Sequence, residues 1–228
     1  MMQSMSTEQL SLAHLVRPPE TDGAPDTLPP LLILLHGVRS NEQDLFALIP
    51  YLDERFIVVS ARAPILMGRN QFGWYHVAFY ADHIDRDEAE FEQSRKQLLQ
   101  FISEAVARYG ADPKRVYLMG FSQGSIMSLA VMLTQPELLA GVVVQSGSLP
   151  VEVLPIAASP DRLKDFPVLV VHGLYDNVLP IAEGRAIKEY FSQLPVKLDY
   201  HEYPMRHEIS DQSLDDVCGW LIAQLNRA

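Results

Sequence analysis

The stretch Gly120-Phe121-Ser122-Gln123-Gly124 determines how the rest of the chain can be organised. It follows the apolar run 116–119 and precedes the helix-like run 125–133, so the sequence predicts a strand, a sharp turn and a helix. Glycines two positions before and after a serine let the backbone reverse tightly and hold the hydroxyl above a sheet. Ser122 is therefore a candidate nucleophile if a base and an orienting acid follow it; without them it is a serine in an ordinary turn.

Composition favours a globular protein. The 228 residues are 48% hydrophobic and 21% charged, and a chain of this length can bury a core as one α/β domain spanning residues 1–228. The first residues lack a basic and apolar leader, and no apolar stretch reaches the ~20 residues of a membrane-spanning helix. We therefore expect a soluble, cytoplasmic protein with no stable membrane insertion. The lone Cys218 agrees with a reducing compartment.

Charge and histidine spacing argue against other classes of protein. The net charge of -11 would repel phosphate backbones, so nucleic acid is not expected as a partner. The seven histidines are scattered, with no pair at zinc-site spacing, so a metal site is not expected.

Apolar runs alternate along the chain with helical patterns, which predicts an α/β fold with a mostly parallel sheet, helices on both faces and no separate large cap domain. Residues 61–85 and 146–165 are expected to be loops, because proline and glycine interrupt them. The predicted strands are 10–16, 31–35, 56–60, 115–119, 139–145, 168–171 and 196–203, and the predicted helices are 41–52, 86–109, 125–133, 181–194 and 210–225.

In an open α/β sheet the chemistry lies at the carboxyl ends of the strands. Asp176 follows the predicted strand 168–171, and His207 follows the strand 196–203. The chain order Ser122, Asp176, His207 is that of α/β-hydrolases, in which histidine takes the serine proton and aspartate orients the imidazole. Other carboxylates and histidines compete for these roles, but they precede the required position or lie inside strands: Asp161, Asp165, Asp199, His36, His172 and His201. We expect His36 and His172 to be structural.

Acyl transfer also needs donors for the developing oxyanion, normally the backbone N–H after the nucleophile and one N–H from an earlier strand–loop junction. The first would be Gln123, and our choice for the second is Val38, in the turn that begins at His36-Gly37. A simple strand-ending turn explains His36-Gly37 equally well.

Four segments together resemble the phospholipase/carboxylesterase family of α/β-hydrolases, which includes acyl-protein thioesterases: 35–37, 120–124, 172–180 and 203–207. The resemblance implies a cofactor-free serine hydrolase acting on small ester, thioester or lysophospholipid substrates, with Ser122, Asp176 and His207 as triad. Ser125 departs from the glycine common in the family, as does His76 from its common aspartate. A carboxylesterase leads, with acyl-protein thioesterase and lysophospholipase as alternatives. A non-catalytic binding protein of the same fold is the alternative from another class.

The segment 72–80 is too aromatic for a purely solvated connection. We expect it beside Ser122, with Phe72, Trp74 and Phe79 binding the acyl group. Two other readings stay open: Trp74 and Phe79 belong to the core, or the loop forms a lid or the surface of a homodimer.

Overall fold

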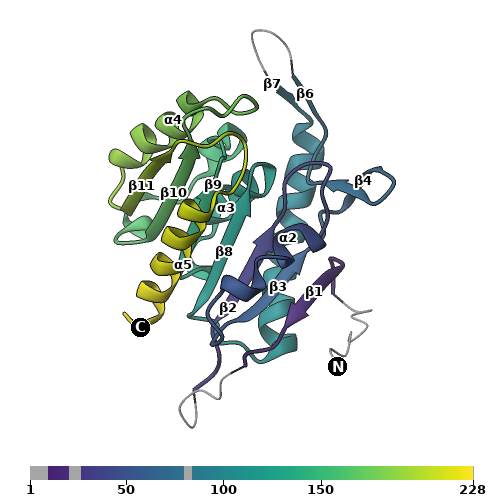
Figure 1. Cartoon of the computed structure of the whole chain (residues 1–228), viewed down its shortest axis with the longest axis vertical. Helices are drawn as coiled ribbons and strands as arrows, with labels where there is room; N and C mark the ends of the chain where they lie inside the picture. The colour runs from purple at the N-terminus through teal and green to yellow at the C-terminus, as the bar shows by residue number, and fades with distance from the viewer. Residues whose placement is uncertain (1–9, 21–26, 80–83, 228) are drawn as a thin grey trace.

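The computed structural model describes residues 10–20, 27–79 and 84–227. Its centre is a seven-stranded sheet with the strand order β1-β3-β2-β8-β9-β10-β11 (Figure 1). The six strands from β3 to β11 pair in parallel, and β1 pairs antiparallel with β3 at one edge. Their bounds are β1 His14–Arg17, β2 Leu31–Leu35, β3 Ile57–Ala61, β8 Val116–Phe121, β9 Gly141–Gln145, β10 Pro167–Gly173 and β11 Lys197–Tyr203.

Helices cover both faces of this sheet, as the alternation predicts (Figure 1). On one face α2, α3 and α4 pack against alternate strand residues such as Ile33 and Val144. On the other face, α1 and α5 pack against the strand residues that alternate with the first set, such as Leu34 and Val143. Because both faces are buried, the inner strands are continuous apolar runs. The helices are α1 Gln43–Phe46, α2 Glu88–Tyr109, α3 Gln123–Thr134, α4 Ile181–Ser192 and α5 Asp211–Leu225.

The predicted loop at 61–85 is wrong in part, because it contains two small antiparallel hairpins. β4 (Ile65–Gly68) pairs with β5 (Gln71–Gly73), and β6 (Val77–Phe79) pairs with β7 (Ile84–Arg86). Neither hairpin joins the central sheet, so neither shows the long apolar runs of its strands. The predicted helix at 41–52 is also wrong in length. It is divided into α1 and a 3₁₀ helix at Ile49–Tyr51 that contains Pro50.

The predicted irregular segment 146–165 contains two further 3₁₀ helices, at Val151–Ile156 and Pro160–Leu163, and a third lies at Pro136–Leu138. Within the described residues, no helix has both the length and the apolarity needed to cross a membrane. The assignment of the whole chain to a single domain stays a prediction.

Candidate active site

The turn between β8 and α3 confines Ser122 to a strained conformation. Its φ of 52° lies in the left-handed region that non-glycine residues rarely adopt. The two glycines are required by the close approach of other backbone: a Cβ on Gly124 would lie 1.9 Å from the carbonyl oxygen of Leu35, and one on Gly120 would lie 2.4 Å from the carbonyl carbon of Gly124. The elbow therefore packs directly against the end of β2, which places the Ser122 hydroxyl at the carboxyl edge of the sheet.

The three residues that the chain order selects lie within hydrogen-bond distance of one another. His207 Nε2 is 2.9 Å from Ser122 Oγ, and His207 Nδ1 is 2.7 Å from Asp176 Oδ2. If the Nδ1–H donates to the buried carboxylate, Nε2 is free to accept the serine proton. This relay is the arrangement by which a serine hydroxyl becomes a nucleophile.

Asp176 and His207 are themselves held by backbone contacts. Asp176 Oδ1 accepts hydrogen bonds from the N–H groups of Val178 and Leu179, at 2.9 and 2.8 Å, which leaves Oδ2 directed at His207. The loop carrying His207 approaches β10 so closely that a Cβ on Gly173 would lie 2.4 Å from the Arg206 carbonyl oxygen. A side chain at position 173 would push this loop, and His207 with it, away from Asp176.

The competing residues make other contacts. Asp199 accepts from the Trp220 indole at 2.8 Å, and Asp165 pairs with Lys197 at 3.4 Å. The structural role expected for His36 and His172 stays a prediction, and both imidazoles contact backbone groups. His36 contacts the Gly37 carbonyl at 2.7 Å and the Ala63 N–H at 3.0 Å. His172 Nε2 contacts the Leu179 carbonyl at 2.8 Å and also lies 3.6 Å from Asp176 Oδ2, the carboxylate oxygen that faces His207. Burial lowers the pKa of His36, so it is a neutral support beneath the loop after β2.

Ser125, which sequence reasoning treated only as a departure from the family, ties three elements together. Its hydroxyl lies 2.7 Å from the Gly120 carbonyl and 2.8 Å from the Gln145 carbonyl, and it accepts from the Gln145 N–H at 2.8 Å. These contacts join the end of β8, the start of α3 and the end of β9. The sequence offered little signal for this role, because the same helix also carries the polar residues Gln123, Ser128 and Thr134.

The two proposed oxyanion donors border the same cavity as Ser122. The turn that carries Val38 is in direct contact with the elbow, since a Cβ on Gly37 would lie 3.3 Å from the Ser122 Cβ. Gln123 has a second role that sequence reasoning missed. Its side-chain Oε1 accepts from the Trp74 N–H at 2.7 Å and its Nε2 donates to the Tyr75 carbonyl at 2.7 Å. The residue after the nucleophile thereby fixes the backbone of the aromatic segment.

The structure does not place Trp74 and Phe72 where we expected them. Trp74 is fully buried in the core and donates its indole N–H to the His36 carbonyl at 3.0 Å. Phe72 packs against the core, with the Arg62 guanidinium 4.6 Å from its ring centre. Neither lines the cavity at Ser122, because both pack toward the core, and Tyr75 and Val77 of the same segment line it instead. The Phe79 side chain lies outside the described part of the structure, so its predicted role stays a prediction.

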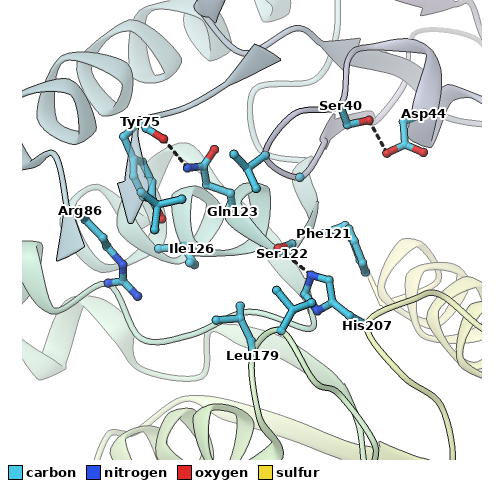
Figure 2. Close-up of a pocket in the computed structure, with 14 residues that line it drawn as sticks. Ser40, Asp44, Tyr75, Arg86, Phe121, Ser122, Gln123, Ile126, Leu179 and His207 are labelled. Atoms are coloured by element: carbon cyan, nitrogen blue, oxygen red, sulfur yellow. Dashed lines mark hydrogen bonds between the residues drawn. The ribbon is translucent and has the colours of Figure 1, made fainter. Parts of the chain in front are cut away.

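The cavity at Ser122 has a volume of about 210 Å³, which is below the usual range for drug-sized ligands. Figure 2 shows Ser122 and His207 at one end and Tyr75 and Arg86 toward the other. Burial raises the pKa of Tyr75 well above its usual range, so its phenol is neutral. The lining residues are Gly37, Val38, Ser40, Asp44, Tyr75, Val77, Arg86, Phe121, Ser122, Gln123, Ile126, Val178, Leu179 and His207.

A family model described as Phospholipase/Carboxylesterase matches residues 23–224. The chain belongs to this family. Its relatives include Carboxylesterase SOBER1 from Arabidopsis thaliana, 29% identical over an alignment that covers 61% of this chain and 61% of that protein. Acyl-protein thioesterase 1 from Eremothecium gossypii is 29% identical, over 85% of this chain and 87% of that protein.

Other members differ in what is said of their activity. A protein from Oryza sativa named "Probable inactive carboxylesterase" is 28% identical, over 92% of this chain and 90% of its own length. Among solved structures, the Bacillus cereus carboxylesterase superposes with a TM-score of 0.80 at 22% identity, over 93% of this chain and 94% of that chain. This likeness confirms the predicted α/β-hydrolase fold.

In the part of the chain that the structure describes, no three His, Cys, Asp or Glu side chains are grouped as they would be around a metal ion. The carboxylate of Asp176 and the imidazole of His207 are already engaged with each other. The constellation is suited to proton transfer between a hydroxyl, an imidazole and a carboxylate.

Proposed function

We propose that this protein is a serine hydrolase that cleaves carboxylic ester or thioester bonds of small acyl substrates. Ser122 Oγ attacks the carbonyl carbon while His207 Nε2 takes its proton. The oxyanion that forms accepts hydrogen bonds from the backbone N–H groups of Val38 and Gln123. His207 then returns the proton to the departing alcohol or thiol, leaving an acyl-Ser122 ester. A water molecule, deprotonated by His207, hydrolyses that ester and releases the acid.

The observation that carries this proposal is the unbroken chain of contacts from Asp176 through His207 to Ser122, at 2.7 and 2.9 Å. It ends at a hydroxyl bordering a cavity, which is where a substrate carbonyl has to lie. Membership of the Phospholipase/Carboxylesterase family supports the same chemistry.

Two alternatives use the same chemistry on other substrates. The relative named acyl-protein thioesterase supports a thiol leaving group, and the family description supports a lysophospholipid. We rank a small carboxylic ester first, because a cavity of about 210 Å³ holds a short acyl group better than a long one. A cytoplasmic location and a homodimer stay proposals drawn from the sequence.

A non-catalytic binding protein is the alternative from another class. The rice relative named "Probable inactive carboxylesterase" supports considering it. The hydrogen bond between His207 and Ser122 favours catalysis, since a binding protein has no need of an activated hydroxyl. Labelling with a fluorophosphonate probe separates the two: an activated Ser122 forms a covalent adduct that peptide mass mapping locates. A protein that binds acyl compounds but resists the probe at every concentration would overturn the proposal.

A further inference from the structure

The end of the cavity away from Ser122 contains a largely buried cation, the guanidinium of Arg86. Arg86 lies in β7 and its side chain is 12% exposed. Its guanidinium donates to Glu152 at 3.0 Å and to the Ser148 hydroxyl at 2.7 Å. Figure 2 shows the guanidinium at the end of the cavity remote from His207, beyond Ile126 and Leu179.

An arginine is an unexpected closure for a pocket that takes a plain alkyl chain. Removing a charged group from water is costly unless partners compensate it, so apolar side chains normally close such pockets. Apolar side chains line part of the cavity, including Val77, Ile126 and Leu179, and Figure 2 shows Ile126 and Leu179 between Ser122 and Arg86. The Arg86 guanidinium therefore lies where we expect the far end of a short acyl group whose carbonyl carbon is at Ser122.

Its partners support Arg86 from outside the cavity. Arg86 lines the cavity at Ser122, whereas Glu152 and Ser148 do not. The contacts to these two residues use two of the five N–H bonds of a guanidinium, a group whose planar fork can hold a second carboxylate. Glu152 therefore compensates the charge and orients the fork without filling the space in front of it.

Charge along the cavity is also asymmetric. At the end opposite Arg86 lies Asp44, whose carboxylate accepts from the Ser40 hydroxyl at 2.6 Å (Figure 2). An anionic group is repelled by Asp44, whereas at the other end the Arg86 guanidinium borders the cavity and its partner Glu152 does not. The neutral Tyr75 phenol, toward the Arg86 end, adds a hydrogen-bond donor of no opposing charge.

We propose that the acyl group accepted by this site ends in a carboxylate that pairs with Arg86, so that the preferred substrates are half-esters or half-thioesters of short dicarboxylic acids. This inference rests on the serine hydrolase activity proposed above. The carboxylate at Arg86 takes no part in the chemistry. Ser122 attacks the other, esterified carbonyl, the alcohol leaves with the proton from His207, and water releases the free dicarboxylate.

The test compares two esters of similar shape that differ in charge: monoethyl succinate, and ethyl 4-methylpentanoate, in which an isopropyl group replaces the carboxylate. Ethanol release yields kcat/KM for each. The wild type should prefer monoethyl succinate by at least about tenfold, and Arg86→Leu should lower this ratio by on the order of 10- to 100-fold, the range for a charged hydrogen bond. Half-esters of malonic, glutaric and adipic acid then locate the best chain length.

Two further variants separate a change in substrate preference from a general loss of folded protein. Glu152→Gln retains the cation without its compensating charge and should raise the ratio. Arg162→Leu removes an arginine whose pair with Glu137 lies on the surface, and should leave both rates unchanged.

Each opposing result has a distinct meaning. Turnover of the neutral ester with no preference for the half-ester overturns the role of Arg86 and leaves the hydrolase proposal standing. If the preference for monoethyl succinate is unchanged in both Arg86→Leu and Glu152→Gln, Arg86 does not bind the substrate carboxylate. Failure of both esters, together with no fluorophosphonate adduct at Ser122, defeats the proposed function and this inference with it.

Discussion

The two ends of the cavity are built in different ways. At the catalytic end, Ser122, Asp176 and His207 follow strands of the central sheet, and backbone packing at Gly124 and Gly173 holds them in place. At the other end, Val77 and Arg86 pair with each other in the hairpin β6-β7, which does not join that sheet. If the proposals above hold, the core of the fold fixes the chemistry, and a hairpin outside the central sheet contributes to the choice of acyl group.

Removing the proposed nucleophile should give the largest effect at the catalytic end of the cavity. Ser122→Ala should lower kcat on the order of 10⁶-fold, because the three residues act as a unit. The fold should survive, since alanine requires no more space. Initial-rate kinetics with an ethyl ester measures the effect, and circular dichroism checks the fold. Substantial turnover by a folded Ser122→Ala variant would place the chemistry elsewhere.

Changing the orienting acid tests the same end more gently. Asp176→Asn retains an oxygen for the N–H groups of Val178 and Leu179 but favours the wrong tautomer of His207, and kcat should fall by about 10⁴-fold. Asp199→Asn is the control, because that carboxylate contacts Trp220. Equal losses in the two variants would contradict the assignment of the acid.

Trp74 tests where the aromatic segment belongs. Trp74→Ala should reduce the free energy of unfolding by about 3–5 kcal/mol, because it empties a large buried site and removes a hydrogen bond to His36. Urea denaturation measures this loss, with the 62% exposed Tyr51→Ala as a control that should cost little. The preference for acyl chain length should not change. If Trp74→Ala instead weakens the preference for acyl chain length and leaves the free energy of unfolding unchanged, Trp74 binds the acyl group.

The smallest expected effect is a pH dependence of stability. Burial lowers the pKa of His36 and of His14 below 6.5 in the folded chain. The unfolded chain therefore binds protons first, and stability is lost as pH falls from about 6.5 toward the folded values. Thermal melts between pH 7.5 and 5.5 should show a decrease of a few degrees that His36→Gln reduces and the exposed control His201→Gln does not. A melting temperature that rises on acidification would contradict this sign.

Much of the framework could be predicted because the physical signal is local. A parallel strand buried on both faces has to be apolar throughout, so β2 was predicted at its observed bounds. The triad positions followed from the order of strand ends. The contacts that bring Ser122, Asp176 and His207 together agree with that choice, and their catalytic role stays our proposal.

The parts that were missed depend on contacts between distant segments. Trp74 became a core residue through the Gln123 amide and the His36 carbonyl, 49 and 38 positions away. Nothing near Arg86 in the chain indicates that Glu152, 66 positions later, would orient it beside the cavity. Ser125 acquired its role from the Gln145 backbone in the neighbouring strand. The pattern of neighbouring residues in the sequence cannot predict these contacts, because they form between segments that only the assembled sheet brings together.

The position of β11 at the open edge of the sheet bears on how the protein behaves at high concentration. An unpaired strand edge can recruit the edge of another molecule and seed aggregation, and charged side chains oppose this. Lys197, Asp199 and His201 are the exposed residues of β11. Lys197 and Asp199 are already paired, with Asp165 and Trp220. The edge is thereby blunted by charge, and neutralising substitutions there should lower solubility long before they affect catalysis.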